Sequence, residues 1–307
     1  MRLVTGRRLA VIKRIVEIGT PSHLRLDHAQ LVVSRDGVDS GTVPVEDLGV
    51  LIVDHPGVSY TQALLSACFE GNVVVVLCNA KHLPCAALLP LAGHSLHAKT
   101  LRAQILASQP VQKRLWQTIV QAKIREQAGV LRSLVLDDVP LPAYAARVKS
   151  GDPDNVEAQA ARIYWGKLFG ADFRRDRDMD GINALLNYGY AILRAAVARA
   201  VVGAGLSPAL GIHHHSQYDD LALADDLMEP LRPLVDLKVH ELARDNPKAT
   251  VDKNSKSALL QILSWDCRWG PTAETRRLPL LTALAYYAAG VRAVLCEGAK
   301  ATAIPGI

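Results

Sequence analysis

The 307-residue chain changes its residue pattern once, close to Pro90, and this change limits the possible folds more than any other feature. From about residue 24 to residue 88 the signals are those of strands and tight turns. The short apolar runs GVLIVD and NVVVVLC are typical of strands buried on both faces. Asp36-Gly37 lies between two β-branched runs and predicts a hairpin. One helix is expected between the apolar runs, with its C-terminal end at Gly71.

After Pro90 the chain is rich in Ala, Leu, Gln and Arg at helical spacing. Long helices are expected in VQKRLWQTIVQAKIREQA, NVEAQAARIYWGKLFG and NALLNYGYAILRAAVARAVVGAG. The charged segment between Gly170 and Gly181 has no apolar period, which predicts a surface loop. Since the length also favours two domains, we predict an α+β protein. A small β-rich domain, a β-sandwich carrying one helix, is expected at residues 1–92, and a larger all-α domain at residues 93–307.

Positive charge is concentrated in one part of the chain. The formal net charge is +5, and seven basic residues between Lys99 and Arg132 face a single acid, Glu126. Such a cluster is the electrostatic pattern of a phosphate-binding surface, although a solvated helix face gives the same pattern. The basic residues are Lys99, Arg102, Lys113, Arg114, Lys123, Arg125 and Arg132.

The cysteines and the apolar segments predict the cellular compartment of the protein. Five cysteines without a CxxC pair predict reduced thiols, with Cys68 and Cys78 as small core residues. The long Ala/Val segment after Tyr190 is interrupted by Arg194 and Arg199, and no segment has the pattern of a signal peptide. We therefore expect a soluble cytoplasmic protein without a membrane partner.

The segment GIHHHSQYDDLALADDLMEPLRPLVD, residues 211–236, contains the strongest chemical signal. Its second half predicts a helix in which Asp225 and Asp226 share a face with Glu229. Acids this close need a compensating cation, and Arg232 is the simplest one. The upstream histidines make a divalent ion the alternative, because imidazole and carboxylate oxygens together suit catalytic metals. Only one or two of the three histidines can bind one ion.

A further acid, Glu157, comes early in the predicted helix NVEAQAARIYWGKLFG. Asp152 and Pro153 predict the start of that helix. Glu157 lies beside its apolar stripe, where a carboxylate either caps the helix or faces a site. The residues alone leave both readings open.

Several of these segments resemble the CRISPR-associated adaptation integrase, the first-numbered protein of CRISPR systems, in its type II form. The similar segments are VLIVDHPGVSYTQALLSACFEGNVVVVLCNAKHLPCAALLPLAGH, LWQTIVQAKIREQA, NVEAQAARIYWGKLFG, NALLNYGYAILRA and the histidine segment. They occur in the family's order between about residues 24 and 245. Leu231 and Ser216 depart from the usual aromatic and asparagine, and the tail after Asp245 matches only loosely.

The resemblance implies a site. It assigns the ligands of a magnesium or manganese ion, and the catalytic residues, to Glu157, His214 and Glu229; the histidine stands fifteen residues before the glutamate of DLMEPLRP. Asp225, Asp226 and Tyr164 are expected as neighbours of the site. Arg162 and Arg232 are expected to bind DNA.

The resemblance also implies a function. It describes a homodimer, paired through the N-terminal domain, that assembles with the second-numbered CRISPR adaptation protein. The complex inserts protospacer DNA fragments into repeat DNA of a CRISPR array by attack of a 3′-hydroxyl on a phosphodiester bond, as a defence of prokaryotes against phage and plasmids. The alternatives are a metal-dependent DNA nuclease that does not integrate, a non-catalytic DNA-binding scaffold and, more distantly, a zinc hydrolase.

Overall fold

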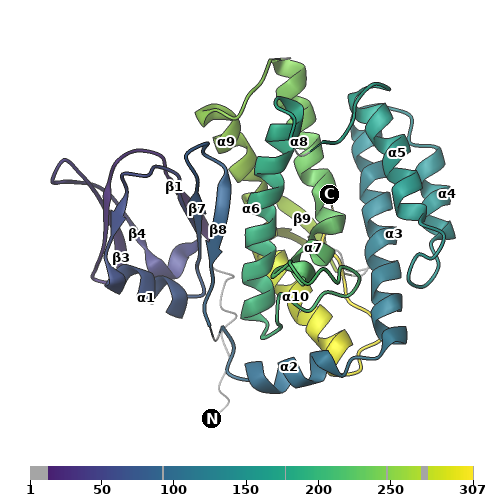
Figure 1. Ribbon diagram of the computed structural model, residues 1–307, viewed down its shortest axis with the longest axis horizontal. Coiled ribbons are helices and arrows are strands. Elements are labelled where there is room, and N and C mark those ends of the chain that lie inside the picture. The colour runs from purple at the N-terminus through teal and green to yellow at the C-terminus, as the bar shows by residue number, and fades with distance from the viewer. Residues whose placement is uncertain (1–12, 92, 177, 247, 271–275, 307) are drawn as a thin grey trace, which may run out of the picture.

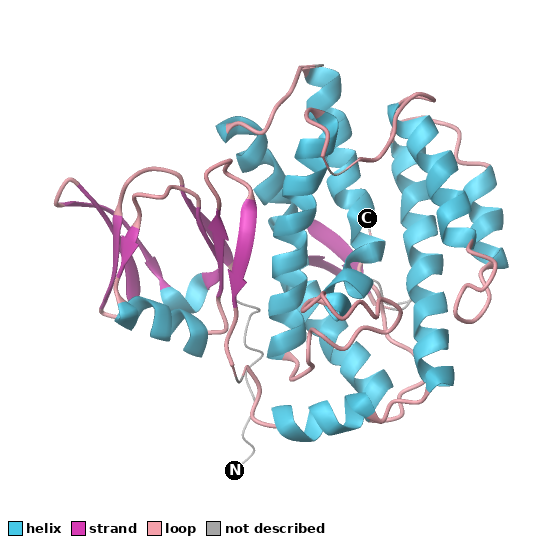
Figure 2. Ribbon diagram, viewed as in Figure 1, coloured by secondary structure: helices cyan, strands magenta, loops and turns pink. Residues whose placement is uncertain are grey.

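The computed structural model describes residues 13–91, 93–176, 178–246, 248–270 and 276–306. Strands make up the N-terminal part and helices most of the remainder (Figures 1 and 2), so the predicted α+β class is confirmed. The predicted domain boundary falls in the connection between strand β8 and helix α2. Residues 1–12, 92 and 307, at the ends of the predicted domains, lie outside the described residues.

The N-terminal strands form two four-stranded sheets. The first sheet has the order β1 (Arg14–Ile18), β5 (Leu48–Val53), β7 (Val74–Cys78), β8 (Pro84–Leu88). The second has the order β4 (Val38–Pro44), β3 (Gln30–Arg35), β2 (His23–Asp27), β6 (Ser59–Tyr60). In the first sheet β1, β5 and β7 are parallel, and β8 adds an antiparallel edge. The short helix η1 (Val45–Asp47) precedes β5.

The apolar runs form the central strands, as predicted. Alternate side chains of β5 point to opposite faces of the sheet. Leu51 and Val53 belong to a core shared with the second sheet, whereas Val50 and Ile52 belong to the core of the helical part. The predicted hairpin joins β3 and β4, with Asp36 and Gly37 at φ 51° and 80°. Glycine suits such a turn because it has no side chain to oppose a positive φ.

Helix α1 (Gln62–Glu70) ends at Gly71, as the sequence predicts. The helical part consists of α2 (His97–Ile105), α3 (Gln109–Ser133), α4 (Pro140–Arg147), α5 (Val156–Phe169), α6 (Ile182–Gly203), α7 (Ala222–Met228), η2 (Glu229–Leu231), α8 (Arg232–Asp245), α9 (Lys253–Leu260), η3 (Gln261–Ser264) and α10 (Leu280–Cys296). It also contains a short antiparallel pair, β9 (Asp266–Trp269) and β10 (Arg276–Pro279), which the expected all-α domain did not include.

Helix α6 is the centre of the helical part and lies beside β8 (Figure 1). By length and composition alone α6 could cross a membrane, but 78% of the relevant window is buried inside the protein. That burial is typical of a core helix. Arg199, which interrupts its apolar pattern, donates a hydrogen bond from Nε to the Asn72 carbonyl at 2.5 Å.

A buried ion pair also joins the strands to the helices. Lys256 on α9 forms an ion pair with Asp54, at the end of β5, with Nζ 2.8 Å from Oδ2 and both side chains buried.

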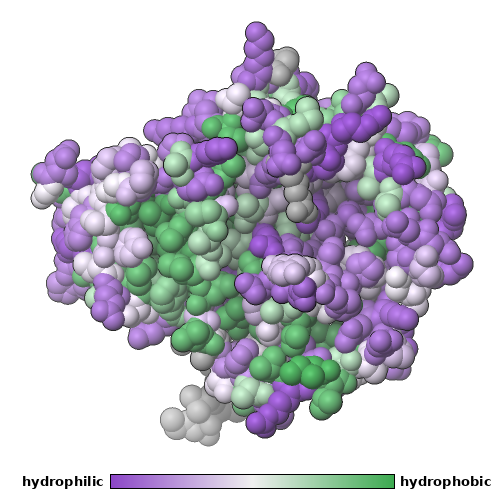
Figure 3. All heavy atoms as spheres, viewed as in Figure 1, coloured by the Kyte–Doolittle hydropathy of each residue, from purple (hydrophilic) through white to green (hydrophobic). Residues whose placement is uncertain are grey.

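On the face drawn in Figure 3, apolar side chains gather where the strands meet the helices. A cavity of about 600 Å³ is lined there by residues of β8 and α6, including Ala87 and Ala195.

Candidate active site

Glu157 lies in the first turn of α5. The predicted helix start at Pro153 is wrong, because the helix begins at Val156. Asp152 nevertheless holds the helix end, since its two carboxylate oxygens accept the backbone N–H groups of Val156 at 2.9 Å and Glu157 at 3.0 Å. This fixes the backbone from which the Glu157 side chain extends, and that side chain is 24% exposed.

Glu229 lies where α7 gives way to η2, and its side chain is buried. The next residue is Pro230, and α8 then begins at Arg232. Arg232 donates a hydrogen bond from Nε to Glu229 Oε1 at 2.8 Å. Arg232, the compensating cation that the sequence predicts, therefore contacts Glu229.

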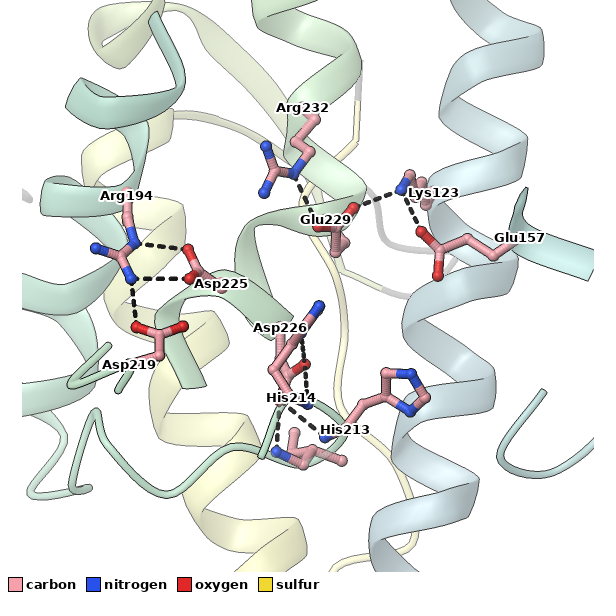
Figure 4. Close-up of polar contacts among 11 residues, drawn as sticks. Lys123, Glu157, Arg194, His213, His214, Asp219, Asp225, Asp226, Glu229 and Arg232 are labelled. Atoms are coloured by element: carbon pink, nitrogen blue, oxygen red, sulfur yellow. Dashed lines mark hydrogen bonds and ion pairs between the residues drawn. The ribbon is translucent and has the colours of Figure 1, made fainter. Parts of the chain in front are cut away.

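A second cation joins the two glutamates (Figure 4). Lys123 on α3 places Nζ 2.5 Å from Glu157 Oε1 and 2.5 Å from Glu229 Oε2. Burial by itself lowers the pKa of the lysine, but the attraction of Glu229 and Glu157 outweighs it and raises that pKa. Burial likewise favours the neutral form of Glu229, yet Lys123 and Arg232 hold its pKa well below the usual range. The site thus contains two carboxylates turned toward one ammonium group.

His214 is held by Asp226, which is completely buried. Asp226 Oδ1 lies 2.6 Å from His214 Nδ1, and the same carboxylate accepts backbone N–H groups of Ile212, His213 and His214. Gly211 permits the tight loop, because a Cβ there would lie 2.1 Å from the His214 carbonyl oxygen. The bond to Asp226 raises the pKa of His214. It also leaves Nε2 as the ring nitrogen available to a ligand.

The other predicted neighbours of the site differ in their contacts and exposure. Asp225 faces away from His214 and forms an ion pair with Arg194 on α6, with Nε 2.6 Å from Oδ1. Arg162 is exposed on α5. Tyr164 is fully buried, and its hydroxyl donates a hydrogen bond to Asp236 at 3.1 Å. Of Asp225 and Asp226, therefore, it is Asp226 that contacts the predicted metal ligand His214.

The remaining histidines have different surroundings. His213 stacks on Trp116 of α3, with ring centroids 4.2 Å apart and the planes at 2°. His215 lines a cavity of about 340 Å³ together with Leu210 and His214. Of the three consecutive histidines, only His214 has its ring bonded to a buried carboxylate among the contacts of the described residues.

Asp236 forms a buried polar group behind Arg232. It accepts hydrogen bonds from the hydroxyls of Tyr164 and Tyr190, and the Arg232 guanidinium lies over the Tyr190 ring, 4.6 Å from its centroid. Burial raises the pKa of Asp236 to about 7, and the two tyrosine hydroxyls and the charges of Arg232 and Lys123 only partly offset that rise. The sequence analysis did not single out this residue.

The raised pKa of Asp236 predicts a pH-dependent stability. Below its ordinary value of 3.8 the group is protonated in both states; between pH 4 and 7 only the unfolded chain releases the proton, so stability falls as pH rises. The integrated loss is on the order of 4 kcal/mol. We expect Asp236→Asn to remove this dependence. Urea unfolding from pH 4 to 8 would show the free energy of unfolding shifting in favour of the variant; a constant difference would contradict the assignment.

The donor chemistry of Glu157, Glu229 and His214 fits a divalent ion. Two carboxylates converge on one cation, and an imidazole with Nδ1 fixed by a carboxylate is the usual form of a metal-binding histidine. Within the described ranges, however, no group of three His, Cys, Asp or Glu side chains stands close enough to surround an ion. The side chain of Lys123 holds the position between the carboxylates (Figure 4).

A cavity of about 540 Å³ opens beside His214. Arg175, Arg194 and Arg232 contribute to its wall, together with Tyr190 and Ser216. Asp219 and Asp225 also line it, and both are paired with Arg194. The guanidinium groups on this wall can bind a phosphate, whereas the Tyr190 ring is buried, with Arg232 and Arg175 over it.

Comparisons with known proteins settle the family. The family model described as "CRISPR associated protein Cas1" matches residues 17–261, most of the chain and all of the residues of this site. The chain belongs to the Cas1 family. The CRISPR-associated endonuclease Cas1 of Neisseria meningitidis serogroup C (strain 8013) is 42% identical over 245 residues, which cover 79% of this chain and 80% of that protein.

Solved structures carry the same fold. A casposase bound to integration product has a TM-score of 0.74 at 18% identity and covers 94% of this chain and 91% of its own. A chain of a partial Cas6-RT-Cas1–Cas2 complex has a TM-score of 0.60 at 18% identity, with coverages of 93% and 96%. The predicted membership of the first-numbered CRISPR-associated protein family is thus confirmed, as are the strand-rich N-terminal and mostly helical C-terminal regions.

Proposed function

We propose that the chain is a divalent-metal-dependent DNA endonuclease and integrase that joins DNA fragments to repeat DNA. The observation that carries the proposal is the convergence of Glu157 and Glu229, from different helices, on one cation position. Asp226, which orients the ring of His214, lies on α7, the helix directly before Glu229. The related Neisseria protein is named an endonuclease, and the casposase holds an integration product, which supports both halves of the proposal.

Glu157, Glu229 and Nε2 of His214 would hold magnesium or manganese. A bound ion of this kind supplies Lewis-acid stabilisation of the charge that develops on the scissile phosphate. Asp226 keeps the ring of His214 in one orientation, and Arg232 keeps the Glu229 carboxylate ionised and in place. The exposed Arg162 and the guanidinium groups of the neighbouring cavity would position the DNA backbone without reading its sequence.

The reaction is a phosphoryl transfer that conserves the number of phosphodiester bonds. The 3′-oxygen of the fragment forms a bond to the phosphorus of the repeat strand, and the bond from that phosphorus to the repeat's own 3′-oxygen breaks. The proton of the attacking hydroxyl passes through solvent, and the leaving oxygen gains one. Water in place of the 3′-hydroxyl gives endonuclease cleavage at the same residues.

We propose that the chain acts as a homodimer with a Cas2 partner, since a structural relative belongs to a Cas1–Cas2 complex. The test is a strand-transfer assay with a pre-cut fragment bearing a 3′-hydroxyl and a plasmid carrying a repeat, with and without Cas2. We expect joined product with magnesium or manganese. Cleavage without joining would support a nuclease alone, DNA binding without cleavage would support a scaffold, and activity restored only by zinc after chelation would support a zinc hydrolase.

A further inference from the structure

Lys123 is the charged side chain that the proposed chemistry does not yet use. It projects from the buried face of α3 between Trp116 and Gln127, both of which are also buried. Its ammonium is within 2.5 Å of one oxygen of Glu157 and one oxygen of Glu229. The second oxygen of Glu229 accepts Arg232. The two carboxylates and the two cations therefore cancel in charge.

This balance opposes the entry of a divalent ion. An ion bound by Glu157 and Glu229 would stand close to the Lys123 ammonium, and two cations in partly buried surroundings repel strongly. It would also leave the four side chains and the ion with an excess of two positive charges. A phosphodiester brought by DNA carries the negative charge that reduces this excess and can accept the ammonium.

We propose that Lys123 competes with the metal ion for Glu157 and Glu229. When DNA binds, the Lys123 ammonium moves to a DNA phosphate and the competition ends. The side chain keeps the two glutamates together in the free protein, and metal loading becomes strong once DNA is bound. Metal and DNA then strengthen each other's binding by the same factor, as linkage requires. This inference rests on the proposed function, because it assumes that Glu157 and Glu229 hold the ion.

Titration calorimetry with manganese tests the inference on the full chain. Lys123→Met removes the charge, and Lys123→Gln keeps hydrogen-bond donors for the glutamates if the first variant folds poorly. We expect either variant to bind manganese at least about tenfold more tightly than the unmodified chain, a difference of about 1.4 kcal/mol. Lys81→Met, at an exposed position between β7 and β8 and outside the basic cluster, is the control and should leave the affinity unchanged.

The second measurement repeats the titration with a phosphorothioate duplex, which resists cleavage, after subtraction of the heat from the duplex alone. The duplex should tighten manganese binding in the unmodified chain and have little effect in the Lys123 variants. Equal or weaker manganese affinity in both variants overturns the inference. If manganese binding is unaffected by Glu157→Ala, the proposed metal site fails, and the inference with it; if Glu157→Ala abolishes binding and the lysine variants do not tighten it, only the inference fails.

Discussion

Replacing Glu157 with alanine should lower both DNA cleavage and strand transfer by about a thousandfold or more. The carboxylate is a proposed ligand, and losing the stabilisation that a bound ion provides costs several kcal/mol in the transition state; about 4 kcal/mol corresponds to a thousandfold in rate. Rates of joined and cleaved product under single-turnover conditions measure the effect. The fold should survive, because the Glu157 side chain is 24% exposed and Lys123 retains Glu229.

Glu157→Gln separates the charge from the shape of this residue. Its amide oxygen can still accept the Lys123 ammonium, but a neutral ligand holds a divalent ion far less well. We expect the glutamine variant to be nearly as inactive as the alanine variant while binding duplex DNA like the unmodified chain. Glu70→Gln, at an exposed position on α1, is the matched control. Joining at the unmodified rate in Glu157→Ala would remove Glu157 from the proposed site.

The fold was predictable where local pattern decides structure. β5 and β7 are continuous apolar runs because both of their faces are buried, and Gly71 ends α1 because the chain turns there. β1 was not predicted, since RIVEI becomes a strand only by pairing in parallel with β5. The β9–β10 pair is equally dependent on its surroundings, because each strand has only four residues. Such short segments have no periodicity long enough to detect.

The candidate site was predictable in its acids, its histidine and the cation Arg232, but not in Lys123. Lys123 belongs to a run of basic residues that reads as a solvated surface, and its partners lie 34 and 106 residues away. One signal was available: Lys123 occupies the apolar stripe of α3 that Trp116, Ile119 and Val120 define. A charge on such a stripe indicates a buried partner, although it cannot identify it. Asp236 gave a comparable signal, since it lies on the buried face of α8 with Pro233 and Val239, but its partners on α5 and α6 could not be identified from the sequence.

Asp225 and Asp226 show how docking decides between equivalent residues. Both share the turn of α7 that leads to Glu229, and the sequence offers no reason to prefer one. In the packed helix Asp225 meets Arg194 at the rim of a cavity, whereas Asp226 points into the loop before the helix and binds its backbone. The two side chains differ in direction by one residue around the helix axis. Only the positions of α6 and the loop determine which of them contacts His214.

Replacing Asp226 with alanine should therefore destabilise the chain by about 3 to 5 kcal/mol, because several buried donors lose their acceptor at once. The affected groups are the backbone N–H groups of Ile212, His213 and His214 and the ring of His214. Asp226→Asn should fold better, but its single amide oxygen cannot accept all four donors. We expect roughly a 10- to 100-fold loss of manganese affinity or strand transfer in Asp226→Asn, as for other residues that orient a metal-binding histidine.

The matched control is Asp225→Asn, one residue earlier on the same helix. Its partner Arg194 retains Asp219, with the nearest atoms 2.6 Å apart, so unfolding should change by only about 1 kcal/mol. Urea denaturation of both variants gives the stabilities, and calorimetry with manganese gives the affinities. Asp226 supports the loop and His214 together, so Asp226→Asn must lose metal affinity by a larger factor than Asp225→Asn. Equal losses in the two variants would mean that the acidic turn acts through general charge and not through the orientation of His214.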